Sequence, residues 1–373
     1  MSNKFVKPGE VARDASIVLN NLLVTGNLVS RDNEAKFKGN KIGDSMKVTV
    51  PPVLGDPNEF SGNTSATSIV ESEIDLTLEK HFYHRVDLTT KQKTLELHDF
   101  TRLVTIPVMR SFSQGIDKYF HNQMQVFRAQ LAGTIGNRPE TIAHLAAGNK
   151  VMNDNFIPNT GRVMLVDTTV ESSLLQLAQF TSADYGTDGP AGLRDATLGT
   201  RFGFTYVRNA LLGAFNRGDV GGTVLVDATT AVGSETLVVK DLTEATGTIK
   251  AGTVFTVAGD TTRYVVRKDA AIASNKATLT IYPAIKAQAA GDAAVTMEAA
   301  GYMNVAFHPS AITGAIVAPE PLWGGNSVVE SYNGIGIRIS QDSSVTTLAD
   351  SIVFDCFVGA RVIQPNGGVL IAG

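Results

Sequence analysis

Residues 105–131 read TIPVMRSFSQGIDKYFHNQMQVFRAQL and hold the strongest helical pattern in the sequence. Apolar residues recur there at spacings of three and four, which place them on one face of an α-helix. They are Ile106, Met109, Phe112, Ile116, Tyr119, Phe120, Met124, Phe127 and Leu131. A helix from Ile106 to Leu131 would be about 39 Å long at about 1.5 Å per residue. We expect a single long helix that serves as the spine of the fold.

The ends of this helix have suitable residues. Thr105 can cap the first turn, and Pro107 fits that turn because its missing N–H has no intrahelical partner there. Gly133 and Gly136 suit the other end. The segment also carries a cationic excess, which would suit a face turned to nucleic acid or to a partner protein, although a solvated helix back explains it more simply. The four bases that oppose the single acid Asp117 are Arg102, Arg110, Lys118 and Arg128.

Upstream of the spine, residues 10–25 form an amphipathic pattern that predicts a first helix. Residues 26–45 are polar and charged, with too little apolar content to fold alone, and we expect this arm to lie on another surface. Met46–Pro51 predicts a strand, and Ile74, Leu76 and Leu78 alternate with polar residues in a second one. The two strands predict a long ribbon, which should rest on a partner because an isolated hairpin is barely stable in water.

Charge along the ribbon suggests where it could rest. Between residues 53 and 80, six acids oppose the one base Lys80. A solvated polar face would account for this, but docking on a basic surface of a neighbouring subunit is the sharper hypothesis. The residues that we nominate for such contacts are Glu71, Glu73 and Asp75 on the ribbon, Lys36, Lys38 and Lys41 on the arm, and Arg102 and Arg110 on the spine.

Downstream of the spine, the pattern is mixed. A helix is predicted near Pro139–Asn153, a buried strand at Val163–Val166, a helix capped by Thr168 or Thr169, and a turn and strand at Leu198–Val207. Residues 221–300 differ, because short β segments separated by turns follow one another without a helical stripe, which predicts a small all-β barrel. Its six segments are Thr223–Ala228, Thr236–Leu242, Thr253–Val257, Arg263–Arg267, Ala277–Tyr282 and Ala294–Met297.

Composition narrows the functional classes. Charged residues make up 18% of the 373, below the typical value of about 25%, as expected where much of the surface meets other subunits. The net charge of −4 argues against a dedicated nucleic-acid binder. Residues 1–10 lack the apolar core of a signal peptide, and no apolar run approaches about 18 residues. We expect a soluble, cytosolic product.

No catalytic or metal-binding motif is apparent. The sequence lacks a phosphate-binding loop, an H-E-x-x-H pair and a G-x-S-x-G elbow. His81 and His84 should point to opposite faces of a strand, so they cannot share a metal ion. The lone Cys356 lies in an apolar run, which predicts a buried, inert thiol and excludes an internal disulfide. The sequence predicts no enzyme, no cofactor and no metal site.

The order of these elements resembles the Hong Kong 97-type capsid fold of tailed bacteriophages, and more specifically short-tailed phage coat proteins with an inserted barrel. The resemblance is one of residue type and order, and it spans nearly the whole chain. It is carried by Leu22–Asp32, by the Gly43–Val48 turn and strand with Pro51 and Pro52, by Ile74–Leu78, by Gly115–Asp117, by Phe202–Phe204 with Tyr206, and by Val305–His308.

The resemblance implies an α+β fold with seven segments. They are an N-terminal arm (1–45), an extended E-loop (46–90), a P-domain with the spine helix (91–135), the first part of an A-domain (136–220), the inserted β-barrel (221–300), the second part of the A-domain (301–320) and closing strands shared by the A- and P-domains (321–373).

The implied function is structural. The chain would be a major capsid protein that self-assembles, through pentamers and hexamers, into the icosahedral head enclosing phage DNA. Scaffolding protein and portal are the implied partners, DNA contacts would be non-specific, and no membrane is involved. The protein would be part of the virion and would assemble in the cytoplasm of the host bacterium.

Three other functions remain open at this point. An encapsulin-like cellular compartment could use the same fold, and a neighbouring enzyme with a short docking tail would favour it. A hydrolase with a β-rich accessory domain would need a pocket with converging titratable groups. A β-rich tail or adhesion protein fits residues 221–300 but not the long spine helix.

Overall fold

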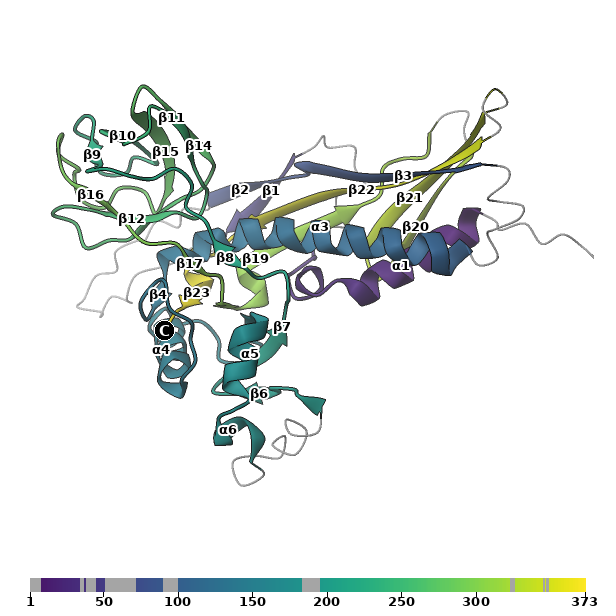
Figure 1. Cartoon of the computed structure of the whole chain (residues 1–373), viewed down its shortest axis with the longest axis horizontal. Helices are drawn as coiled ribbons and strands as arrows, with labels where there is room; N and C mark the ends of the chain where they lie inside the picture. Colours follow the sequence, from purple (N-terminus) through teal and green to yellow (C-terminus); the bar gives the residue numbers. More distant parts are fainter. Residues whose placement is uncertain are drawn as a thin grey trace, which may run out of the picture. The chain divides into compact units, whose positions relative to one another are not determined.

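The computed structural model describes residues 8–33, 37, 45–50, 72–89, 100–182, 195–322, 326–344, 346 and 349–373 (Figure 1). The protein is a mixed α/β structure that forms two compact units, each discontinuous in sequence. Within the described ranges, no helix is long and apolar enough to cross a membrane. The first unit comprises Met1–Leu23, Val29–Gly115 and Thr313–Gln364, and the second comprises Val24–Leu28, Ile116–Ile312 and Pro365–Gly373.

A five-stranded sheet forms the body of the first unit. Its strands follow the order β19-β22-β21-β20, and β3 also pairs with β22, in antiparallel register over ten residues. The β20–β21 hairpin turns through Asn333 and Gly334, both with positive φ, as the favoured two-residue turns require. The strands are β3 (Lys80–Thr89), β19 (Ile312–Val317), β20 (Asn326–Tyr332), β21 (Ile335–Ser344) and β22 (Ala349–Val362).

Alternation along β3 gives the sheet two different faces. The Phe82 ring lies against Gly115 of the spine helix, and the His84 ring is 6.5 Å from that of Phe112. Tyr83 and its cross-strand neighbour Asp355 therefore belong to the opposite face. The first helix, α1 (Pro8–Leu22), packs against β20 and β21.

The two strands predicted for the ribbon are present, and they rest on their own chain. Strands β1 (Ser45–Val50) and β2 (Ser72–Thr77) pair in antiparallel register, with Val48 opposite Ile74. Buried side chains of the two strands form an apolar cluster with Ala315 and Val317 of β19. The expected support from a neighbouring copy therefore concerns the exposed face of these strands, where Glu73 and Asp75 lie, and residues 51–71, which lie outside the described residues.

The spine helix is shorter than predicted and begins differently. The α-helix α3 spans Ile106–Met124, about 28 Å at about 1.5 Å per residue, and a 3₁₀ turn continues it over Gln125–Ala129. Thr105 is not its cap, because a π-helical turn at Thr101–Thr105 precedes it and the Thr105 side chain is buried. Pro107 has no N–H to donate one turn back, so a wider turn at this point fits the sequence.

A six-stranded sheet with three helices organises part of the second unit. The strand order is β4-β23-β18-β5-β7-β6, and the predicted strand Val163–Val166 is fully buried near its middle as β5. The other strands are β4 (Leu131–Ala132), β6 (Thr200–Arg201), β7 (Phe204–Arg208), β18 (Val305–Phe307) and β23 (Gly368–Ile371). The helices are α4 (Ile142–Asp154), α5 (Thr168–Leu174) and α6 (Ala178–Thr181).

Helix α5 is capped by Asp167, not by Thr168 or Thr169 as predicted. One Asp167 carboxylate oxygen accepts hydrogen bonds from the backbone N–H groups of Thr169 and Val170, at 2.8 and 2.7 Å. The cap is therefore one residue earlier, because the carboxylate can accept from two N–H groups of the first turn at once.

All six β segments predicted between residues 221 and 300 are present, and two more strands were missed. The missed strands, TGTI and AAIA, are rich in Gly and Ala, which are depleted in strands and gave no β signal. The eight strands are β9 (Leu225–Val226), β10 (Thr236–Lys240), β11 (Thr246–Ile249), β12 (Val254–Val257), β13 (Tyr264–Val266), β14 (Ala270–Ala273), β15 (Lys276–Tyr282) and β16 (Val295–Met297).

This β-rich segment has its own core and closely spaced ends. Its strands surround a cluster of buried side chains that includes Val239, Phe255, Tyr264 and Leu279. Immediately outside it, β8 (Ala214–Phe215) pairs in antiparallel register with β17 (Gly301–Tyr302). The chain therefore enters and leaves the segment through two adjacent strands.

Candidate functional site

The described contact residues that the sequence nominated are exposed but do not come together. Glu73 and Asp75 lie on β2, and Glu73 pairs with Lys47 across the ribbon at 2.7 Å. The hydrogen bond that Lys47 donates to Glu73, followed by the negative charge of Glu73, raises the pKa of Lys47. Arg102 and Arg110 are exposed on the helical run of the first unit. Glu71, Lys36, Lys38 and Lys41 lie outside the described residues.

The other cations predicted on the back of the spine behave differently from one another. Lys118 is exposed, whereas Arg128 is buried, so the prediction of a solvated helix back is wrong for Arg128. The Arg128 guanidinium lies 3.9 Å from the centre of the Phe215 ring, which stabilises the cation by a cation–π contact. Burial lowers the pKa of Arg128 to about 10, partly opposed by the charge of Glu298.

A buried polar cluster in the second unit joins residues distant in sequence. The Asp117 carboxylate accepts hydrogen bonds from the backbone N–H groups of Val24, Thr25 and Gly26 at 3.0–3.2 Å. The Thr25 hydroxyl lies 2.8 Å from His121 Nε2 and accepts a hydrogen bond from the Asn209 amide at 3.0 Å. Because the Asn209 amide nitrogen can only donate and also lies 3.3 Å from His121 Nε2, that ring nitrogen is the acceptor and the imidazole is neutral.

The two titratable groups of this cluster have opposite pKa shifts. Burial raises the pKa of Asp117 from 3.8 to about 6, although the three N–H donors act in the other direction. Burial lowers the pKa of His121 from 6.5 to about 4. The Asp117 contribution to stability is complete below pH 3.8 and is lost as the pH rises through 6. The His121 contribution is complete above pH 6.5 and is lost as the pH falls through 4.

We predict that these contributions nearly cancel in the native protein. Each amounts to about 3 kcal/mol at about 1.4 kcal/mol per pKa unit. On acidification from pH 6.5 to 4, His121→Gln should gain stability and Asp117→Asn should lose it, so that the two variants diverge by about 5 kcal/mol. Urea unfolding of both variants across this range measures the divergence. Parallel stability curves would contradict the prediction.

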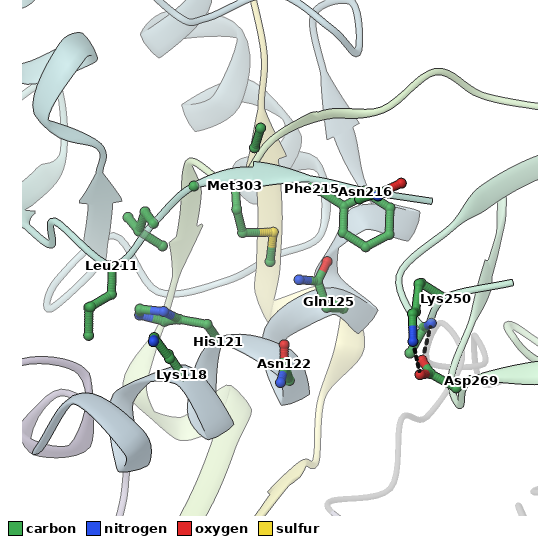
Figure 2. A pocket seen from close by; sticks show the side chains of 14 residues that line it. Lys118, His121, Asn122, Gln125, Leu211, Phe215, Asn216, Lys250, Asp269 and Met303 are labelled. Carbon is green, nitrogen blue, oxygen red and sulfur yellow. Dashed lines mark hydrogen bonds and ion pairs between the residues drawn. The ribbon is translucent and has the colours of Figure 1, made fainter. Parts of the chain in front are cut away.

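A cleft of about 580 Å³ opens beside this cluster (Figure 2). Helix α3 contributes Lys118, His121, Asn122 and Gln125, and the chain around β8 and β17 contributes the opposite wall. Lys250 and Asp269, at one end, pair with each other at 2.8 Å. Among the described lining residues, the Asp269 carboxylate and the His121 imidazole thus already have partners. The cleft offers the amides of Asn122 and Gln125 and the ammonium of Lys118, which are suited to binding.

The remaining histidine and cysteine predictions agree with the structure. The His81 ring lies 4.5 Å from that of Phe357, tilted by 47°, on one face of the sheet, and His84 lies near Phe112 on the other. Cys356 is buried, and desolvation raises the pKa of its thiol. Across the part of the chain that the structure describes, no group of three His, Cys, Asp or Glu side chains could hold a metal ion.

A charged cluster in the first unit escaped sequence analysis. Asp355 is only 2% exposed and accepts two hydrogen bonds from the Arg338 guanidinium, while His81 Nε2 lies 2.9 Å from the same carboxylate. Its members are separated by up to 274 residues, so only the pairing of β3, β22 and β21 brings them together. In the sequence, the only sign of this cluster was that each of its members is a charged or titratable residue within an alternating strand pattern.

The chain has the fold of phage capsid subunits. No family model matches its sequence, and no curated protein is similar to it. Its structure is similar to that of Mycobacterium phage Che8, with a TM-score of 0.52, 17% identity and coverage of 93% of this chain and 90% of the other. It is also similar to the capsid structure of cyanophage P-SCSP1u, with a TM-score of 0.52, 11% identity and coverage of 99% and 89%.

Proposed function

We propose that this protein is the structural major capsid protein of a tailed bacteriophage, which self-assembles into the icosahedral head and has no catalytic activity. The similarity to the cyanophage capsid over 99% of this chain and 89% of the other carries the proposal. It would make the protein a component of the virion, assembled in the bacterial host through pentamers and hexamers. Scaffolding protein and portal would be partners, and packaged DNA would be contacted non-specifically.

The proposal extends to the Hong Kong 97-type arrangement of segments. The N-terminal arm (1–45) would contain α1, and the E-loop (46–90) would contain β1, β2 and β3. The P-domain (91–135) would contain the spine helix α3, and the closing strands (321–373) would include β20, β21 and β22. The α/β sheet around β5 and β18 supports an A-domain divided into 136–220 and 301–320.

The same proposal treats residues 221–300 as an inserted barrel. Strands β10, β15, β13, β12 and β16 pair in series, and β9 pairs with β10. The ring is completed where Leu225 bridges to Ala294, with the Val226 N–H bonded to the Ala293 carbonyl at 2.9 Å. The pairing of β8 with β17 supports insertion into a host domain, because the two ends of the segment are adjacent.

Electron microscopy of the purified protein tests the function. We expect closed shells of uniform diameter, since symmetry multiplies modest contacts into a stable assembly. Small soluble oligomers under all solution conditions would contradict the proposal. Shells that enclose another protein in the native host, in place of DNA, would indicate an encapsulin-like compartment.

We further propose that the acidic ribbon lies across a neighbouring subunit, against the basic arm or the basic spine. The double variant Glu71→Lys and Glu73→Lys should then disturb assembly while the subunit stays folded. The Lys47–Glu73 pair is exposed and screened by solvent, so its loss should leave the stability of the subunit nearly unchanged. Circular dichroism reports folding, and sedimentation reports assembly. Normal particles from this variant would reject the contact.

A further inference from the structure

Phe156 follows helix α4 and has two unusual features. The residue is 94% exposed, the largest exposure among the exposed large hydrophobic residues of the described chain. Its backbone has a φ of +56°, in the left-handed region that side chains with a Cβ rarely occupy. Neither feature improves the stability of the isolated subunit.

The left-handed backbone comes from the way α4 ends. The Ile157 N–H donates to the Met152 carbonyl at 3.1 Å, and the Phe156 N–H donates to the Asn153 carbonyl at 2.9 Å. These two bonds define the Schellman ending, whose left-handed position is normally occupied by glycine or asparagine. The sequence instead has a large aromatic residue where glycine would be less strained.

A buried arginine holds this helix end rigidly. Arg162 is 1% exposed, and its guanidinium donates to the backbone carbonyls of Ile157 and Pro158 and to the side-chain oxygens of Asn149 and Asn153. The first two acceptors directly follow Phe156, and the other two belong to α4. The loop is therefore fixed before any partner arrives, which reduces the entropy lost on binding.

Phe202 provides an internal comparison. It also has a positive φ, 52°, in the turn between β6 and β7. Its ring, however, packs against Phe180 with the ring centres 5.9 Å apart, so the chain uses the side chain internally. Phe156 has the same backbone conformation but an exposed ring.

The surroundings of Phe156 suit contact with an identical molecule. Lys150 and Asp154, the charges nearest in sequence on α4, pair with each other at 3.0 Å, so they do not repel a second copy. Asn155 and Asn159 flank the ring in sequence and provide hydrogen-bonding groups. An aromatic residue with a polar, uncharged rim has the composition of an interface core and its margin.

We infer that Phe156 is an anchor for assembly, inserted into a different surface of a second copy of this chain. A single aromatic ring buries only about 150–250 Å², against about 1,600 Å² for a stable pair, so it needs other contacts alongside it. A closed assembly of many copies supplies them, and the inference therefore rests on the proposed capsid function. An exposed ring such as that of Phe156 fits a head-to-tail contact, in which a surface of one copy meets a different surface of the next copy.

Phe156→Gly separates assembly from folding. Glycine relieves the left-handed backbone, so the thermal stability of the unassembled subunit should be unchanged or higher, whereas the critical concentration for assembly should rise about tenfold or more. Phe156→Trp should restore assembly. Val232→Ala, which truncates another exposed apolar residue of the same unit, should leave the critical concentration unchanged. Assembly of Phe156→Gly at the native concentration, or an equal effect of both truncations, would overturn the inference.

Thiol labelling gives a second readout. The single native cysteine, Cys356, is buried, so in the variant Phe156→Cys the introduced thiol is the one that a reagent can reach. We expect a maleimide to label it rapidly in free subunits and at least about tenfold more slowly in shells, because the head-to-tail contact excludes the reagent. Labelling at the same rate in shells and in free subunits would overturn the inference. Disulfide-linked pairs of subunits within shells would also overturn it, because they require two copies of residue 156 to meet. If the native protein forms no shells at all, the proposed function fails instead.

Discussion

Arg162→Ala is expected to lower the free energy of unfolding by about 3–5 kcal/mol, the largest loss from a single substitution that we predict in the second unit. The guanidinium is buried and donates four hydrogen bonds that join the end of α4 to the following loop. Alanine leaves the carbonyls of Ile157 and Pro158 and two asparagine side chains without these donors. Urea unfolding of the unassembled subunit measures the loss.

Two further variants test this explanation. Arg162→Lys keeps the charge but not the planar fork, so it should recover only part of the lost stability. Arg208→Ala is the matched control. Arg208 is 62% exposed, and its ion pair with Glu171, at 3.4 Å, stabilises the fold by no more than about 1 kcal/mol. Equal losses from Arg162→Ala and Arg208→Ala would show that the buried hydrogen bonds do not stabilise the fold.

Asp355→Ala is expected to have an effect of similar size, about 3–5 kcal/mol, in the first unit. Arg338 is bonded to both oxygens of the Asp355 carboxylate, and its side chain is only 12% exposed. Removal of the carboxylate therefore leaves a largely desolvated cation without its partner. His81 can turn to solvent, because its side chain is 47% exposed.

The double variant Asp355→Leu with Arg338→Met distinguishes an unpaired charge from lost packing. Removal of both charges should restore most of the stability, because no desolvated ion then remains. Asp87→Ala is the control on the neighbouring strand, since that carboxylate is 55% exposed in its pair with Arg85. A double variant as unstable as Asp355→Ala would contradict the charge explanation.

The spacing of apolar residues in the sequence predicted those helices and strands that bury one face, or all of their side chains, in the fold. The apolar stripe from Ile106 to Met124 became α3, the four apolar residues of β5 are buried, and the alternation around Ile74 and Leu76 became β2. In each case the spacing of side chains directly reflects which face is buried.

Features that depend on tertiary contacts could not be predicted in this way. Arg128 and Arg162 carry charges that favour exposure, yet both are buried. The Phe215 ring, from a distant segment, lies over Arg128, and the end of α4 with its following loop folds back to give oxygen acceptors to Arg162. The His121 environment depends on Thr25 and Asn209, which lie 96 and 88 residues away. The exposure of Phe156 was equally hidden, since an aromatic residue beside a helix normally predicts core.

The pairing of β8 with β17 has a consequence for engineering. Residues 214–215 and 301–302 are already side by side as in a hairpin, so a tight turn is long enough to join them directly. The same geometry allows residues 216–300 to be exchanged for any foreign domain whose termini lie one strand spacing apart, about 5 Å. A particle built from such chimaeras would display one cargo domain per subunit, at a site where the host sheet need not be rebuilt.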